Sequence, residues 1–299
     1  MSAIKVKYPS IFLLLLFTNT FAFGQTILRY HLAIGDSFTV QQDAHQSITQ
    51  DTEGMKHVIT NDLQGIIKFK VEGIKEDIYE LQVSFKDLKL KVNSSLQGDL
   101  LVVDALEHEE GDQQSKMFHG LLNIPVTVYM SSQGEILEVR GGDQLVAKMV
   151  EASNMQDPDG IKFLENSLSK EFGSKALSES YEQLTYLYPK KPLSQGDLWE
   201  NEFHGKLKAK NNWVLEGINK DSLQIAGTST IRMLVEDENS SMRLEGTQKS
   251  KVNASTKTGF IKKMHVEGNA SGVAFVGANS ETEIPTQIQS TIIYQLIEN

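Results

Sequence analysis

The sequence predicts an α+β fold with two related, curved antiparallel β-sheet units and a helical segment between them, in a half-barrel-like arrangement. Strand patterns dominate both ends of the chain, helix patterns fill its middle, and short motifs of the first half return in order in the second. Together these features favour a duplicated β-rich unit covered by helices. The expected segments are a signal peptide at 1–24, a first β-rich unit at 25–142, a helical connector at 143–190, and a second β-rich unit at 191–299.

Alternation of apolar and polar residues predicts the strands of the first unit. The pattern occurs at residues 66–71, 78–85, 126–130 and 136–139. A side-chain period of two is typical of a strand with one face in a core. The last two runs are separated by a short Gly-containing turn and therefore predict a hairpin.

The connector predicts helices that pack on the sheets. Asp143 is the expected N-cap of a short helix, and Asp157 the expected start of a second one whose apolar stripe ends at Gly173. A third helix stops before Pro189, because proline cannot continue a helix. An apolar stripe can also mark a partner or membrane face, but packing on a sheet is the simpler interpretation.

Three blocks of sequence recur in the same order and predict an internal duplication. The pairs are 32–38 with 193–199, 71–77 with 215–221, and 128–141 with 252–268. Each Gly-Asp pair is expected to open a strand, with Phe38 or Trp199 in the core. The turn glycines expected to take positive φ are Gly73, Gly134, Gly217 and Gly259.

The N-terminus has the pattern of a cleavable secretion signal. Lys5 and Lys7 precede an apolar core at 11–17, far shorter than the roughly 20 residues of a membrane-spanning helix. Small residues at 22 and 24 predict cleavage just before Gln25; the alternatives are a buried strand and an uncleaved anchor. The chain has no Cys, so we expect a periplasmic or secreted protein without a Cys-linked lipid anchor or disulfides.

The charge balance argues against polyanionic partners. The chain has 29 Lys and Arg against 39 Asp and Glu, a formal net charge of −10. Such a balance repels phosphate backbones, so we expect no nucleic-acid partner. No later stretch is long and apolar enough to predict an integral membrane segment after signal cleavage.

Two patterns are similar to hydrolase motifs but lack their partners. Residues 35–37, Gly-Asp-Ser, match the nucleophile block of the esterases with a Gly-Asp-Ser-Leu signature, yet no Asp-x-x-His follows near the C-terminus to supply a base. Ser167 with Lys170, and Lys-Thr-Gly at 257–259, match penicillin-binding enzymes, but the tripeptide falls in a predicted hairpin turn. We therefore assign no catalytic residue and expect that the protein is not an enzyme.

One cluster has residue types that bind metals: His108, Glu109, Glu110, Asp112 and His119. It lacks the His-Glu-x-x-His spacing of zinc sites and the alternating Asp/Asn pattern of calcium loops. A solvated acidic loop is the favoured interpretation. No phosphate-binding glycine motif occurs either, and we expect neither a metal nor another cofactor.

The Leu-x-x-Gly-Asp-x-Phe block, the Leu-x-x-Gly-Asp-x-Trp block and the Phe-Gly-Gln at the end of the signal together resemble an uncharacterised family of exported Bacteroidota proteins, a domain of unknown function. The resemblance implies a place in a diderm cell envelope and transfers no activity and no functional residue. The expected architecture is also similar in outline to periplasmic lipoprotein carriers, which hold acyl chains in an open half-barrel.

The leading functional hypothesis is non-catalytic binding of an apolar or amphipathic ligand in the concavity between a curved sheet and its helices. The alternative is a structural or protein-interaction module of the envelope, with an exposed sheet edge as docking surface. A hydrolase is the third hypothesis. The expected partner is accordingly a small apolar ligand or an envelope protein, and a lined cavity favours the former whereas an apolar surface patch favours the latter.

Overall fold

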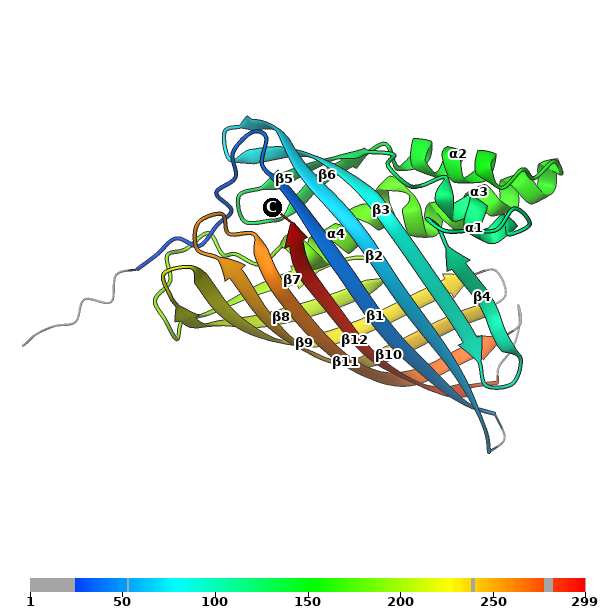
Figure 1. Cartoon of the computed structure of the whole chain (residues 1–299). Helices are drawn as coiled ribbons and strands as arrows, with labels where there is room; N and C mark the ends of the chain where they lie inside the picture. The colour runs from blue at the N-terminus through cyan, green and yellow to red at the C-terminus, as the bar shows by residue number, and fades with distance from the viewer. Residues whose placement is uncertain (1–24, 53, 238–239, 277–281, 299) are drawn as a thin grey trace, which may run out of the picture.

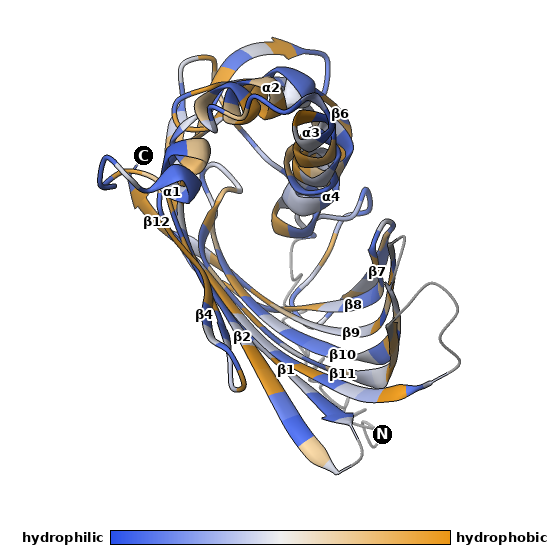
Figure 2. Cartoon of the chain, turned by 90° about the vertical axis from the view of Figure 1, so that its right-hand side faces the viewer, coloured by the Kyte–Doolittle hydropathy of each residue, from blue (hydrophilic) through white to orange (hydrophobic). Residues whose placement is uncertain are grey.

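The computed structural model describes residues 25–52, 54–237, 240–276 and 282–298. The expected signal peptide at 1–24 lies outside the described residues. The described chain forms one large curved antiparallel sheet, and helices lie over part of its concave face (Figures 1 and 2). Among the described residues, no helix combines the length and the apolar character needed to cross a membrane.

Strands make up both halves of the chain, with helices between them. The first half contains β1 (Ser37–Thr52), β2 (Met55–Lys75), β3 (Ile78–Ser94), β4 (Gly98–Asp104), α1 (Gln113–His119), β5 (Val126–Ser131) and β6 (Ile136–Arg140). The helices that follow are α2 (Gly142–Ala152), α3 (Pro158–Phe172) and α4 (Ser174–Thr185). The second half contains β7 (Leu198–Phe203), β8 (Leu207–Ile218), β9 (Ser222–Asp237), β10 (Ser240–Ser255), β11 (Ile261–Val276) and β12 (Ile284–Glu298).

The two halves are parts of a single 12-stranded sheet with the order β6-β5-β3-β2-β1-β12-β11-β10-β9-β8-β7, and β4 pairs with β3 beside β5. The order β1-β2-β3-β5-β6 in the first half matches β7-β8-β9-β10-β11 in the second. β12 joins the halves, for example where Ile288 lies opposite Ile48 on β1. The predicted fold class, two curved antiparallel units with helices between them, is confirmed.

The two Gly-Asp pairs make equivalent turns in the two halves. Gly35 and Gly196 have φ of +93° and +91°, and their N–H groups donate to Val71 and Leu215 at 2.9 and 2.8 Å. The following Asp carboxylate accepts a backbone N–H three residues back in both, at 2.8 and 2.7 Å. Phe38 and Trp199 are buried, as expected. Common ancestry of the two halves stays a prediction, which these matched contacts support.

The expectation for the turn glycines is half right. Gly134 and Gly259 have φ of +94° and +70°, whereas Gly73 and Gly217 do not lie in the left-handed range. Gly73 and Gly217 instead sit at β-bulges, where one strand has an extra residue. The bulge places the first tight turn further along the chain, where Glu76 has φ +57°.

The helix starts were predicted with one error. Asp157 caps α3 by accepting the Gly160 N–H at 2.7 Å, and Gly173 ends that helix. The N-cap of α2 is Gly141, with φ +97°, and not Asp143, which lies in the first turn. The chain leaves β6 through a left-handed conformation that glycine adopts at little cost, and the helix therefore begins earlier.

The predicted apolar stripe of the connector packs on the sheet. Leu177, Tyr181 and Leu184 of α4 are buried in the main core, and Leu168 of α3 joins them. A second, smaller cluster continues along the concave face; it consists of Phe203, Ala209, Ile231, Leu244, Ala270 and Ile288.

The chain from the end of α4 onward is hydrogen-bonded to β7, to the segment before β1 and to the turn between β10 and β11. Trp199 Nε1 of β7 donates to the carbonyl of Leu187 at 2.9 Å. Tyr30 Oη donates to the Thr185 carbonyl at 3.0 Å, and Tyr188 Oη donates to the Gly259 carbonyl at 2.5 Å. These three hydrogen bonds are buried, and the residues that donate them belong to the main core at one end of the concave face.

Candidate functional site

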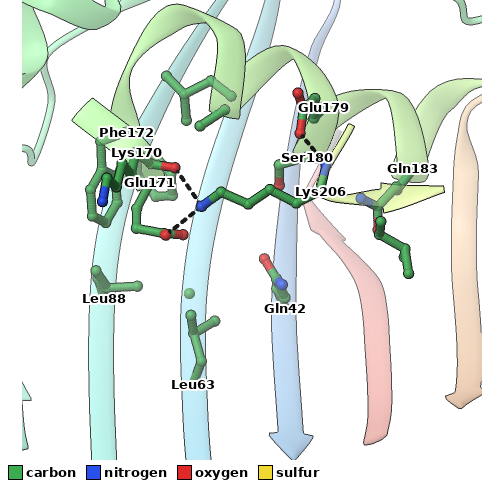
Figure 3. A pocket seen from close by; sticks show the side chains of 15 residues that line it. Gln42, Leu63, Leu88, Lys170, Glu171, Phe172, Glu179, Ser180, Gln183 and Lys206 are labelled. Carbon is green, nitrogen blue, oxygen red and sulfur yellow. Dashed lines mark hydrogen bonds and ion pairs between the residues drawn. The ribbon is translucent and has the colours of Figure 1, made fainter. Parts of the chain in front are cut away.

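A cavity lies between α3–α4 and the concave face of β1, β2 and β3 (Figure 3). Its volume is about 290 Å³. Leu63 and Leu88 form much of the floor, and Phe172 and Leu177 form the helical wall. The cavity therefore has an apolar interior with an opening at the end of α3.

The floor is shaped by a bulge between β2 and β3. Ile66 pairs with Asp87 and Ile67 with Phe85, so the register shifts there by one residue. Since a strand turns alternate side chains to one face, this shift sends both Phe85 and Leu88 toward the helices. Phe85 meets the edge of the Phe172 ring, with ring centroids 6.3 Å apart, so sheet and helix are fixed to each other beside the cavity.

The polar groups inside the cavity are uncharged. Gln42 of β1 points up from the floor and Gln183 lies on the α4 side (Figure 3). Among the described residues, neither side chain has a hydrogen-bond partner within 3.5 Å in the protein. Both amides can therefore donate to and accept from a bound molecule.

The rim is charged, and its charges are paired. Lys206, in the turn before β8, places Nζ 2.6 Å from Glu171 Oε1 and donates to the Lys170 carbonyl at 2.8 Å. Its backbone N–H donates to Glu179 Oε2 at 3.1 Å. The Lys206 and Glu171 side chains are about half exposed or more, and such pairs contribute about 0–1 kcal/mol. This rim can open at low cost.

A second cavity of about 20 Å³ lies deeper under α4. Gln183 borders both cavities, and Trp213 and Tyr294 line the small one. That volume is enough for about one water molecule, so side chains fill the concavity below α4. Burial raises the pKa of Tyr294 to about 12.

One carboxyl beside the cavity has a shifted pKa. Glu182 on α4 is half buried, and this burial raises its pKa, with further help from the nearby charge of Glu135. Low polarity favours the protonated form of a carboxyl.

The hydrolase-like motifs have structural contacts. Ser167 Oγ donates to the Phe163 carbonyl at 2.9 Å along α3, and Ser37 is the half-buried first residue of β1. Neither hydroxyl has a hydrogen bond to a histidine within the described part of the chain. Residues 257–259 lie in the turn between β10 and β11, as predicted, and Gly259 accepts the Tyr188 hydroxyl. That the protein is not an enzyme stays a prediction.

The candidate metal ligands are spread over the loop before α1 and that helix. Asp112 caps α1 by accepting the Ser115 N–H at 2.9 Å. His119 Nδ1 lies 2.8 Å from the Ala105 carbonyl, and its ring is 5.1 Å from that of His108. Within the described ranges, no three His, Cys, Asp or Glu side chains converge on one point, and Glu109 and Glu110 face solvent.

The cavity residues were not identified from the sequence. They come from four strands, two helices and a turn, and Gln42 and Lys206 are far apart along the chain. No local motif joins them. The one signal was the alternation along β1 to β3, which shows that one face is apolar but not where a helix leaves it uncovered.

Comparison with known proteins gives a family and remote likenesses in shape. The model described as "Family of unknown function (DUF6263)" matches residues 76–261, more than half of the chain. No curated protein sequence gives a match.

Three solved structures resemble the sheet at very low sequence identity. Lipovitellin, from a structure of its lipid–protein interactions, is 13% identical with a TM-score of 0.49; the match covers 90% of this chain and 26% of the lipovitellin chain. An outer membrane channel from Pseudomonas putida F1 is 9% identical (TM-score 0.25; 90% and 98% covered). The translocator domain of the autotransporter NalP from Neisseria meningitidis is 7% identical (0.21; 89% and 89%). This chain thus spans about a quarter of lipovitellin, and no residue or activity is transferred from any of the three.

Proposed function

The chain belongs to the family of unknown function DUF6263, and we propose from its own geometry that it is a non-catalytic cell-envelope protein that binds an apolar or amphipathic ligand. The observation that carries the proposal is the cavity of about 290 Å³ between α3–α4 and the sheet. Small-molecule sites are typically concave and apolar, contain a few polar groups, and begin at about 300 Å³. This cavity has that composition and lies at the lower limit of that size.

Two features support binding of a chain-like molecule. The cavity opens at the paired rim of Lys206 and Glu171, which can separate at low cost. Apolar area removed from water contributes about 25 cal/mol per Å², so a ligand chain over Leu63 and Leu88 would be held by burial. The N-terminal signal pattern and the lack of Cys support export of the protein to the periplasm or beyond without a lipid anchor.

The first experiment is native mass spectrometry of the protein purified from its own envelope. Co-purified mass in the range of lipids would support the proposal, as would uptake of fluorescent fatty-acyl probes by the delipidated protein. A clean protein mass together with no probe uptake would contradict it.

A pair of variants locates the site. Ala176→Trp fills the cavity from α4, and we expect it to reduce probe uptake strongly. Lys175→Trp is the matched control, because Lys175 is the neighbouring residue and its side chain is 91% exposed. Equal uptake by both variants would place any bound probe elsewhere.

A second candidate function, protein interaction, is supported by one surface. Among the described strands β4 pairs only with β3, and it carries Leu100 and Val102, which are about half exposed. Leu96 and Leu106 flank it and are also exposed. An uncovered strand edge with apolar side chains can accept a partner strand. A photo-crosslinker at position 102 that captures an envelope protein, in a protein that takes up no probe, would favour this function.

A further inference from the structure

The face of the sheet that is turned toward the helices has no formal charge. In the described strands, the side chains on this face, here called the trough face, include no Asp, Glu, Lys or Arg, and His57 is their one histidine. The trough face comprises even positions 40–50, odd 57–71, positions 81, 83, 85, 88, 90, 92 and 94, odd 199–203, odd 207–215, odd 223–235, even 242–254, even 264–274 and even 284–294.

The opposite face has many charged residues. Examples from six strands are Asp43, Asp62, Lys68, Lys210, Arg232, Glu245, Lys249 and Glu267. Burial in an ordinary hydrophobic core would explain why the part of the trough face under α4 has no charged residues. It does not explain the same absence on the stretch beyond the helices, where Ile48, Ile59 and Asn61 are only half buried.

Uncharged polar side chains form one row across the trough face, and this row is interrupted only at Gly268 among the paired residues below. Directly paired residues build this polar row: Asn201, Asn211, Ser229, Gln248, Gly268, Ser290, Gln46 and Asn61. Apolar rows flank it on both sides. One runs from Phe203 through Ile231 and Ile288 to Ile59, and the other runs from Trp213 through Val266 to Leu63 at the cavity floor.

The polar row is satisfied at its ends and open in its middle. Asn211 donates to Asn201 at 2.9 Å, and Asn61 donates to Gln46 at 3.0 Å. Gln248 and Ser290 are half buried, and among the described residues their side chains have no hydrogen-bond partner within 3.5 Å in the protein. With Gln42 and Gln183 in the cavity, they supply neutral donors and acceptors on an otherwise apolar surface.

We infer that the ligand is an uncharged amphipathic lipid, with an apolar chain and an ester, amide or hydroxyl group that meets these neutral side chains. The inference rests on the proposed function and specifies its ligand class. An ionised carboxylate or phosphate would lose its hydration on the trough face and find no cation there. On the rim, Lys206 is already paired with Glu171. A neutral group loses less hydration and is compensated by single hydrogen bonds.

The test compares monoolein with oleate, which share one acyl chain and differ in head-group charge. Each displaces phenylnaphthylamine, an uncharged fluorescent probe, from the full mature protein at about pH 8, where the carboxylate is ionised. We expect monoolein to bind at least about tenfold more tightly than oleate, a difference of about 1.4 kcal/mol. Lowering the pH should strengthen oleate binding, because the protonated acid is neutral.

Three variants test whether the lack of charge on the trough face causes the preference for monoolein. Gln42→Lys puts a cation on the cavity floor and should reduce or reverse the preference for monoolein. Gln42→Met removes the amide without adding charge, and Gln41→Lys adds the same charge on the opposite face; both should keep the preference.

The outcomes separate the inference from the proposed function. Oleate bound to the wild type as tightly as monoolein would refute the neutral-ligand inference and leave lipid binding intact. An unchanged ratio in Gln42→Lys would refute the role of charge on this face. No probe, monoolein or oleate binding to a folded wild type would overturn both the proposed function and the inference.

Discussion

The hydrogen bond between Asn211 and Ser229 provides a sharp test of how the polar row contributes to stability. These residues lie opposite each other on β8 and β9 and are 2% and 6% exposed. Ser229 Oγ donates to Asn211 Oδ1 at 2.5 Å, and Asn211 Nδ2 donates to Asn201 Oδ1 at 2.9 Å. Neither residue has access to bulk water as a replacement partner.

The cost of each single substitution follows from what it leaves unpaired. Ser229→Ala strands the Asn211 oxygen, and Asn211→Leu strands the Ser229 hydroxyl; leaving one buried polar group without a partner costs about 1–3 kcal/mol. Asn201 Oδ1 still accepts the Trp213 Nε1–H at 2.9 Å in the Asn211→Leu variant. The double variant leaves no partner of this pair unsatisfied. We therefore expect its loss of unfolding free energy to be at least about 1 kcal/mol smaller than the sum of the single losses.

Urea unfolding of the four proteins measures this coupling. The matched control is the pair Asn212 and Thr228, which face each other on the exposed side of the same two strands. Asn212→Leu and Thr228→Ala should each change the unfolding free energy by no more than about 0.5 kcal/mol and should add. If the buried pair also proved additive within about 0.5 kcal/mol, the reasoning about a hydrogen-bonded polar row would be wrong.

Two further predictions address the turn at Gly134 and the carboxyl of Glu182. Gly134→Ala should lower the thermal unfolding midpoint clearly more than Gly98→Ala does. Both glycines have positive φ, but a Cβ at position 134 would overlap the Thr185 carbonyl oxygen, whereas the space around position 98 is open. Equal shifts of the midpoint in the two variants would exclude close packing as the cause. Burial raises the pKa of Glu182. The contribution of this carboxyl to the free energy of unfolding is therefore fully present below the ordinary glutamate pKa of about 4.3, and it is lost as the pH rises through the raised pKa. Glu182→Gln should therefore have a higher urea midpoint than the wild type at neutral pH and the same midpoint near pH 4, and equal midpoints at neutral pH would count against a desolvated carboxyl.

The parts of the fold that depend on local pattern could be predicted, and the parts that depend on distant pairing could not. The alternation in β2, β3, β5 and β6 and the caps at Asp157 and Gly173 are local signals, and each was interpreted correctly. The pairing of β1 with β12 joins residues about 250 positions apart, which no local pattern reveals. The short α1 was missed because only two of its residues are apolar, which is too few to set a period. β4 was missed because its four apolar residues, 100–103, are consecutive and do not alternate with polar ones.

The candidate site shows the same division. Residues 242–254 alternate between neutral side chains such as Leu244 and Gln248 and charged ones such as Arg243 and Lys249. The sequence thus contains the uncharged face. Its meaning depends on α3 and α4, which cover one part of that face and leave the cavity and the polar row beyond it partly open.

Hydrogen bonds exchanged between the two halves hold one end of the trough together. The chain before β1 is held by the second half, where His31 N–H donates to the Thr258 carbonyl at 2.8 Å. The chain after α4 is held by the first half, where Tyr188 N–H donates to the Gln133 carbonyl at 3.2 Å. The segment before the first strand of each half therefore donates a hydrogen bond to a hairpin turn of the other half. Both turns lie at the same end of the strands. Toward the opposite end of these strands, Ile48 and Ile59 on the uncharged face are only half buried. A ligand longer than the cavity could extend along this face without breaking any contact that holds the two halves together.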